Sequence, residues 1–179
     1  MPPFPFVELP YPERQAMRLD GELYAVGEVL VPVGVPDTPE LRAGVALRGR
    51  SSRLIAARRT AAWVWGAVST PPRPAEFIAD LDARWRSIAD GTSAVVESVV
   101  RPGDAVRLGG ARVTSPLRTA LDLARFPEVF GRDDAEIVRR LAEVGGFDAE
   151  AASRALDRTR NLAGKHRALD RIRDALSRS

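Results

Sequence analysis

Three carboxylates, Asp80, Asp82 and Glu97, have the types and spacing that could hold a divalent metal ion. Asp80 and Asp82 are alternate residues of an expected strand over 75–83, so their side chains point to the same face. Glu97 lies on a second expected strand, over 93–100, and would complete an oxygen-ligand site for Mg²⁺. Nucleotidyltransferases hold their metal ions in this way. One hypothesis is therefore an active or degenerate nucleotidyltransferase-like protein.

The glycine signature of such an enzyme is incomplete. The helix that cradles a triphosphate opens on a Gly-Ser or Gly-Gly pair, whereas Gly66 is followed by Ala67. The sequence has no cysteine and a single histidine, His166, which excludes disulfides, a thiol nucleophile and a histidine-based metal cluster. We therefore expect a protein that binds and does not catalyse, without a cofactor or metal, and keep the transferase as an alternative.

Arginine-rich segments offer a different chemistry, the binding of phosphate. Residues 41–60 carry six arginines and no acid, whereas residues 1–40 carry two basic and seven acidic residues. Residues 151–179 carry eight basic and three acidic residues. Such separated charge can attract nucleic acid or an acidic partner. The side chains expected to contact DNA phosphates, without reading base sequence, are Arg48, Arg50, Arg53, Arg58 and Arg59. The alternative, that the last two only face solvent opposite a buried Trp63, stays open.

The first third of the chain has the pattern of a helix followed by a hairpin. A short helix is expected over 12–19, and alternating residues around Gly27 predict a β-hairpin over 22–33. Thr38 and Pro39 are the residue types favoured at the cap and the first position of the next helix.

The rest of the chain predicts a sheet with flanking helices. Residues 51–68 are expected to form one or two helices ending at Gly66, and the strands over 75–83 and 93–100 follow. A hairpin over 104–115 comes next, with its turn at two glycines. The helices expected after it begin at Pro116 and then cover 135–146, 148–161 and 164–176. The fold class is therefore α+β, a mixed sheet with flanking helices and a helical C-terminus.

The segment "RVTSPLRTALDLAR", residues 112–125, is the most strongly patterned part of the chain. Ser115 and Pro116 have the types of a helix cap and a first helical residue, and apolar residues recur on one face of the helix that follows. Arg118 and Asp122 are four apart and can pair on that helix. We interpret the segment as a core helix docked after a strand; a pair that fixes the helix against neighbouring backbone is the alternative.

Four segments resemble, in the right order, members of the AbiEi antitoxin family of the actinobacterial type. "VTSPLRTALDLAR" is similar to the strand–helix signature of that family, and "LIAARRTAAWVWGAV" to its Ala-Ala-Trp…Gly helix. "LDGELYAVGEVLVPV" followed by "TPELRAGVAL" resembles the wing and next helix of its winged helix-turn-helix, and "VVRPGDAVRLGG" the link into the signature. The resemblance covers about residues 10–145. Its signature residues here are Trp63, Thr114, Ser115, Arg118 and Asp122.

This resemblance implies an antitoxin of a type IV toxin–antitoxin system, whose partner toxin is a nucleotidyltransferase. An N-terminal winged helix would bind promoter DNA for autoregulation, and the C-terminal domain would carry the antitoxin activity. The resemblance implies no catalytic residues. A DNA-binding transcriptional regulator without a toxin partner is the alternative.

The N-terminal part departs from the family pattern. A winged helix-turn-helix has three helices before its wing, whereas only residues 1–21 precede the hairpin here. We therefore expect a truncated winged-helix-like segment over 1–50, an AbiEi-like α+β domain over 51–146 and a helical segment over 147–179. The chain shows no signal peptide and no apolar run of about 18 residues, so we expect a cytoplasmic protein without a membrane partner.

Overall fold

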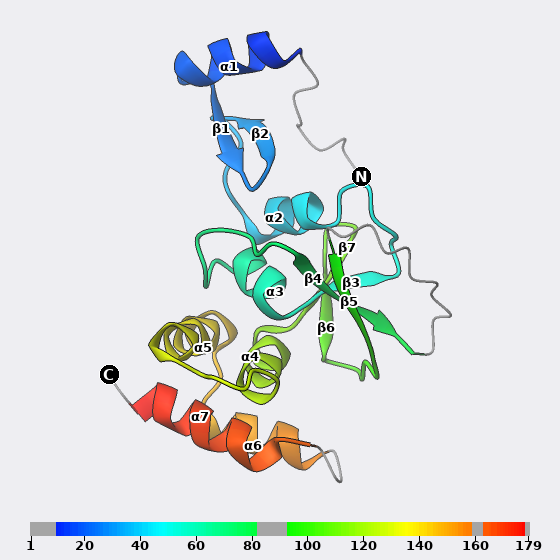
Figure 1. Cartoon of the computed structure of the whole chain (residues 1–179), viewed down its shortest axis with the longest axis vertical. Helices are drawn as coiled ribbons and strands as arrows, with labels where there is room; N and C mark the ends of the chain where they lie inside the picture. Colours follow the sequence, from blue (N-terminus) through cyan, green and yellow to red (C-terminus); the bar gives the residue numbers. More distant parts are fainter. Residues whose placement is uncertain (1–9, 82–92, 159–162, 178–179) are drawn as a thin grey trace.

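The computed structural model describes residues 10–81, 93–158 and 163–177, which form a five-stranded mixed sheet and the helices around it (Figure 1). The strands of this sheet are β3 (Leu54–Ala56), β4 (Ala75–Asp80), β5 (Ser93–Ser98), β6 (Ala105–Leu108) and β7 (Ala111–Thr114). They lie in the order β5-β4-β3-β7-β6. The central strand β3 is antiparallel to β4 and parallel to β7, β5 is parallel to β4, and β6 is antiparallel to β7. The expected α+β class with a mixed sheet is confirmed.

The prediction that residues 51–68 form only helices is wrong in its first part, because Leu54–Ala56 is the central strand β3. Every residue of β3 is buried, so its sequence is a short apolar run without alternation. Periodicity cannot distinguish such a run from a buried helix. The remainder forms α3 (Arg58–Val64), and Gly66 follows with a φ of +79°, the left-handed conformation that ends many helices.

One hydrophobic core lies between the sheet, α3, α2 (Pro39–Ala46) and a separate hairpin of β1 (Leu23–Val26) and β2 (Val29–Pro32). α2 begins as predicted, since the Thr38 hydroxyl accepts a hydrogen bond from the Leu41 N–H at 3.3 Å. This first core contains Val26, Val29, Val31, Leu41, Ala43, Ala46, Leu54, Ala56, Ala61, Trp63, Val64, Phe77, Ala79, Ala111 and Val113.

A second core lies among the C-terminal helices. These are α4 (Pro116–Arg125), α5 (Arg132–Gly145), α6 (Ala149–Asp157) and α7 (Lys165–Ser177). The second core contains Ala62, Ala67, Ala120, Leu121, Leu123, Ala124, Ile137, Val138, Leu141, Ala152, Leu156, Ala168, Ile172 and Ala175. Because α3 supplies Ala61 to the first core and Ala62 to the second, this one helix joins the two.

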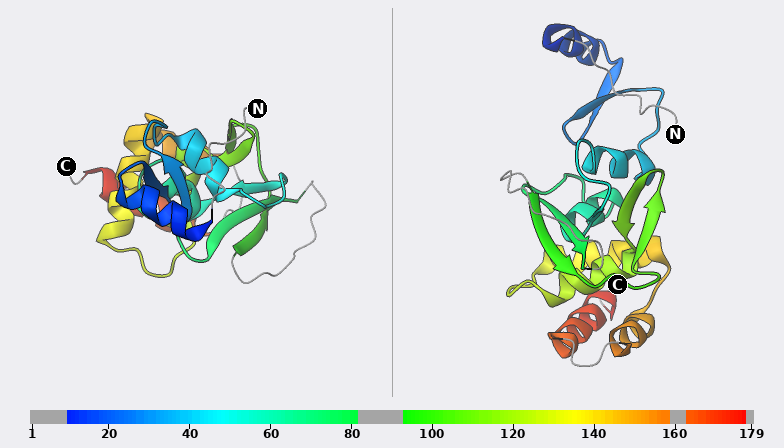
Figure 2. Two further views of the ribbon diagram at one scale, coloured as in Figure 1. Left: turned by 90° about the horizontal axis from the view of Figure 1, so that it is seen from above. Right: turned by 90° about the vertical axis from the view of Figure 1, so that its right-hand side faces the viewer.

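The cores stack along an elongated molecule. α1 (Tyr11–Leu19) stands at one end on the β1–β2 hairpin, and α6 and α7 lie at the other (Figures 1 and 2). α1, which the structure describes in full, buries none of its residues. The helix-then-hairpin order is as expected, but neither core ends at the boundaries expected near residues 50 and 146. None of the described helices is long and apolar enough to cross a membrane.

Part of the C-terminal positive charge is used inside the fold. Arg171 on α7 donates to the carbonyl oxygens of Ala124, Pro127 and Glu128 at 2.9–3.0 Å. Arg167 donates to the carbonyl oxygen of Arg125 at 2.8 Å. The last carbonyl groups of a helix have no partner within that helix, so these arginines satisfy the end of α4 and fasten α7 to it.

Replacement of Ile172 by Ala tests whether α7 belongs to the core of α4 and α5. Ile172 is fully buried, so we expect the free energy of unfolding to fall by about 2–5 kcal/mol. Urea denaturation followed by circular dichroism measures it. Val144→Ala on α5 is the control, since Val144 is 53% exposed and should change stability by less than about 0.5 kcal/mol. Equal effects of the two substitutions would contradict the shared core.

Candidate functional site

The carboxylates proposed as a metal site do not share a face of the sheet. In the pairing of β4 with β5, Asp80 is opposite Ser98 and Ala79 is opposite Glu97. Paired residues share a face and successive residues alternate, so Asp80 and Glu97 point to opposite faces. Asp82 lies outside the described residues, among which no group of three His, Cys, Asp or Glu could hold a metal ion. The expectation that these carboxylates converge is therefore wrong for Asp80 and Glu97.

Arg58 and Arg59, two of the proposed DNA contacts, are tied to acidic neighbours. The residue before α3 supplies no capping side chain, and the Glu76 carboxylate takes that place by accepting a hydrogen bond from the Arg59 backbone N–H at 2.9 Å. The Arg59 guanidinium pairs with Asp134. Arg58 lies 3.9 Å from the other Glu76 oxygen and 4.5 Å from the ring centroid of Phe126. The charge of both arginines is thus partly compensated within the fold.

Arg48, Arg50 and Arg53 lie in the segment that joins α2 to β3. Arg48 and Arg53 are exposed, and Arg50 is half-buried. The Arg50 guanidinium lies 5.1 Å from the ring centroid of Phe77, in the range of a cation–π contact. Arg48 and Arg50 both line a pocket that Arg53 does not line. The structure therefore separates the five candidates into two groups, one at this pocket and one at the start of α3.

The pocket lies where the β1–β2 turn meets the segment between α3 and β4, and it has a volume of about 560 Å³. Its lining includes the buried Trp63 from α3 and the partly buried Val45 from α2. Arg73 and Glu28, from its two sides, form an ion pair at 2.7 Å. Sequence reasoning named Arg48, Arg50 and Trp63 separately, and the structure brings them to this one place.

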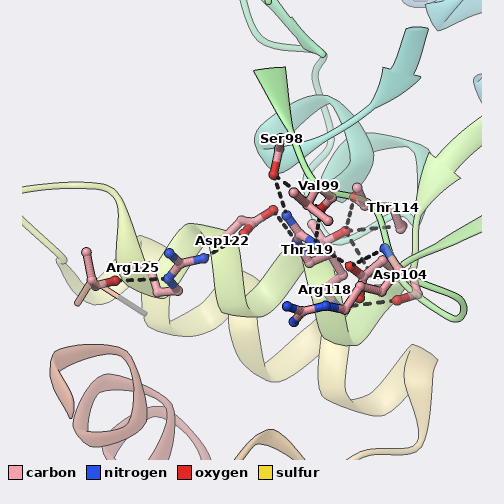
Figure 3. A network of polar contacts seen from close by, with 11 residues as sticks. Ser98, Val99, Asp104, Thr114, Arg118, Thr119, Asp122 and Arg125 are labelled. Atoms are coloured by element: carbon pink, nitrogen blue, oxygen red, sulfur yellow. Dashed lines mark hydrogen bonds and ion pairs between the residues drawn. The ribbon is translucent and has the colours of Figure 1, made fainter. Parts of the chain in front are cut away.

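A second group of polar side chains surrounds Arg118 at the start of α4 (Figure 3). The Arg118 Nε donates to Asp122 Oδ2 at 2.9 Å, one terminal nitrogen pairs with Asp104, and the other donates to Ser98 Oγ at 3.1 Å. Arg118 also donates to the carbonyl oxygen of Val99 at 3.5 Å. The predicted pair of Arg118 and Asp122 is confirmed, and so is the alternative in which Arg118 holds α4 against neighbouring backbone.

Asp122 is the most deeply buried charged group of this network, with 1% of its side chain exposed. Burial raises the pKa of the Asp122 carboxyl, against the attraction of Arg118 and Arg125. Burial also opposes the charge on Arg118, but Asp122 and Asp104 outweigh it and raise the pKa of Arg118. A guanidinium keeps its proton at neutral pH, so Arg118 is a partly buried cation that Asp122 and Asp104 stabilise. The pair helps to fix α4, since Asp122 Oδ2 accepts from Arg118, while Asp122 Oδ1, which accepts no hydrogen bond from the described part of the chain, lies 3.6 Å from Arg125.

The signature residues Thr114 and Ser115, just before α4, make further hydrogen bonds to α4 and to the end of α3. The Ser115 hydroxyl caps α4 by accepting from the Arg118 backbone N–H at 3.4 Å. The hydroxyls of Thr114 and Thr119 lie 2.7 Å apart, and the indole N–H of Trp65 donates to the carbonyl oxygen of Thr114 at 2.8 Å. Strand β7, helix α3 and helix α4 are thereby joined by directional bonds as well as by apolar packing.

Sequence reasoning missed Asp104, Ser98, Glu76 and Arg73. Asp104 and Ser98 are 14 and 20 positions from Arg118, and no spacing rule connects residues so far apart.

A scan against models of protein families and a search of curated proteins found no match to this chain.

Substitution of Asp122 by Ala tests the importance of the buried pair. Arg118, with 14% of its side chain exposed, would lose its least exposed partner, and we expect the free energy of unfolding to fall by about 3–5 kcal/mol. Glu150→Ala is the control, because its i,i+4 pair with Arg154 is exposed on both sides and contributes only about 0.3–0.5 kcal/mol.

The double variant Arg118→Met/Asp122→Leu should recover much of the loss, since it removes both buried charges together. Urea denaturation of all variants measures these effects. An Asp122→Ala effect no larger than that of Glu150→Ala would contradict the proposed role of the pair.

Proposed function

We propose that this protein acts by binding and not by catalysis, as an AbiEi-like antitoxin or a transcriptional regulator derived from one. Its partner would be a toxin of the nucleotidyltransferase type, and promoter DNA would be a second partner. The protein would bind both partners in the cytoplasm. The β1–β2 hairpin with α1 would represent a reduced winged helix, and the sheet with α3 and α4 the antitoxin domain.

The observation that supports this proposal is that the four segments that resemble the family contact one another in the folded structure. Trp65 of the second segment bonds to Thr114 of the signature at 2.8 Å. Arg118 of the signature pairs with Asp104 of the link. Val29 of the hairpin segment shares the first core with Trp63. The four segments thus form one continuous architecture, as a resemblance of the whole domain requires.

A DNA-binding regulator without a toxin is the second candidate, favoured by the exposed Arg48 and Arg53 on the segment between α2 and β3. Exposed guanidinium groups bind phosphate well and need no fixed base sequence. Arg58 and Arg59 contribute less in this arrangement, because Glu76 and Asp134 lie beside them.

Co-expression with a toxin of the nucleotidyltransferase type tests the antitoxin function. We expect this chain to restore growth of cells that produce the toxin, because binding alone would neutralise it. The Ile172→Ala variant, if destabilised as expected, serves as the matched control and should rescue less. Failure of the stable wild-type chain to restore growth would remove the antitoxin function.

DNA binding across a salt series tests the regulator function. If Arg53 contacts a phosphate, Arg53→Ala should weaken binding equally on promoter and random duplex, and should lower the slope of log K against log salt by about 1. Arg154→Ala, on the distant helix α6, should leave the slope unchanged. Fluorescence anisotropy gives both constants, and absence of binding by the wild-type chain at low salt would exclude the DNA role.

A further inference from the structure

The pocket beside the β1–β2 turn combines an apolar interior with several cations. Its volume of about 560 Å³ lies within the range of about 300–1,000 Å³ that is usual for ligand sites. No residue of α4 lines the pocket, and neither does the exposed Arg53. The role given to α4 and the proposed DNA contact at Arg53 therefore do not use this pocket.

The interior of the pocket is apolar and closely built. Val29, Val45 and Trp63 line it, from β2, α2 and α3. A Cβ atom on Gly27 would lie 3.5 Å from both Trp63 and Val45, and the φ of Gly27 is +60°. These are ordinary van der Waals distances, so it is the positive φ, which glycine adopts without strain, that favours glycine at this turn beside Trp63.

A further part of the lining consists mainly of prolines. Pro71, Pro72 and Pro74 line the pocket together with Ala75. Proline has a fixed φ and no backbone N–H, so this part of the lining is stiff and offers few hydrogen-bond donors. It suits an apolar group more than a polar one.

The cations of the lining outnumber its carboxylates. Among the residues that the structure describes, Arg48, Arg50 and Arg73 line the pocket with one acidic side chain, Glu28. Arg50 is held in place, since it donates to the Ala46 carbonyl oxygen at 3.3 Å and lies over a phenyl ring. The pair of Arg73 with Glu28 is more than 70% exposed on both sides, and such pairs are weak. An incoming carboxylate can therefore take the place of Glu28 beside Arg73.

A nucleotide fits this chemistry less well than an acidic protein segment does. The edge of a nucleobase needs hydrogen-bond partners, and buried donors or acceptors without them cost binding energy. Apart from its charged side chains and the Trp63 indole N–H, the described lining offers the Thr60 hydroxyl, which is 1% exposed and already accepts from the Glu76 backbone N–H at 2.7 Å. An apolar side chain would fill the interior without that loss.

We propose that this pocket receives an apolar side chain of a partner protein whose neighbouring residues are aspartate or glutamate. The apolar group packs on Val29, Val45 and Trp63, and the flanking carboxylates pair with Arg48 and Arg73. This inference rests on the proposed function as a protein that binds a toxin, and it specifies the surface of that partner.

A peptide titration of the full-length, ¹⁵N-labelled protein tests the proposal. The probe is acetyl-Glu-Asp-Leu-Glu-Asp-amide, followed by the Gly27 amide and the Trp63 indole N–H signals. We expect saturable shifts of these two signals. Peptides with Ser in place of Leu, or with Lys in place of all acidic residues, should bind at least about tenfold more weakly, because each loses one of the two interactions.

Variants separate the pocket from general electrostatics. Arg48→Glu/Arg73→Glu changes two exposed side chains and should weaken peptide binding by at least about tenfold. Arg107→Glu, an exposed residue of β6, is the control and should change it by less than about twofold. The proposal is overturned by absence of saturable shifts, by equal binding of the Ser peptide, or by tighter binding of adenosine monophosphate at the same signals.

The peptide titration tests the pocket assignment and the growth assay tests the antitoxin function, so a negative result in one does not decide the other. Peptide binding without growth rescue would keep the pocket assignment and remove the antitoxin function. Growth rescue that is unaffected by Arg48→Glu/Arg73→Glu would keep the antitoxin function and place its partner elsewhere.

Discussion

The fold depends on the burial of α3 on two opposite sides. This short helix contacts the sheet and the hairpin through Ala61 and Trp63, and the C-terminal helices through Ala62. A helix in such a position needs small side chains, because adjacent helices approach to 8–10 Å only where the contact residues permit it. The Ala-Ala pair meets that need, and the two cores of the elongated molecule are joined as a result.

Directional bonds then fix how α3 meets its neighbours. Arg42 of α2 donates to the carbonyl oxygen of Trp63 at 2.9 Å and pairs with Asp37. The Trp65 indole bonds to β7, and Arg118 connects α4 to the ends of β5 and β6. Apolar packing alone permits helices to slide, whereas buried polar groups must find their partners or lose free energy. These bonds therefore select one arrangement among those that would bury the same apolar area.

The sequence predicted contacts between residues close in the chain and missed those between residues far apart in it. Thr38, Ser115 and the pair of Arg118 and Asp122 act within one helical turn, so their roles were predictable from spacing. Strand β3 was not, because a strand buried on both faces carries no alternation. The pocket was not predictable either, since Gly27 and the segment at Pro71–Pro74 are far apart in the chain and meet only in the folded structure.

The distribution of arginines indicates where a partner would bind. At the C-terminal end, Arg167 and Arg171 already bond to the last carbonyl groups of α4. Near the start of α3, Glu76 and Asp134 compensate Arg58 and Arg59. At the hairpin end, Arg48 and Arg73 are exposed beside an apolar pocket, and Arg73 pairs with the exposed Glu28. An arginine whose bonds hold buried parts of the fold together is costly to divert to a ligand, whereas an exposed ion pair such as that of Arg73 with Glu28 contributes little and is easily exchanged. The hairpin end therefore offers a partner both an apolar pocket and exposed arginines.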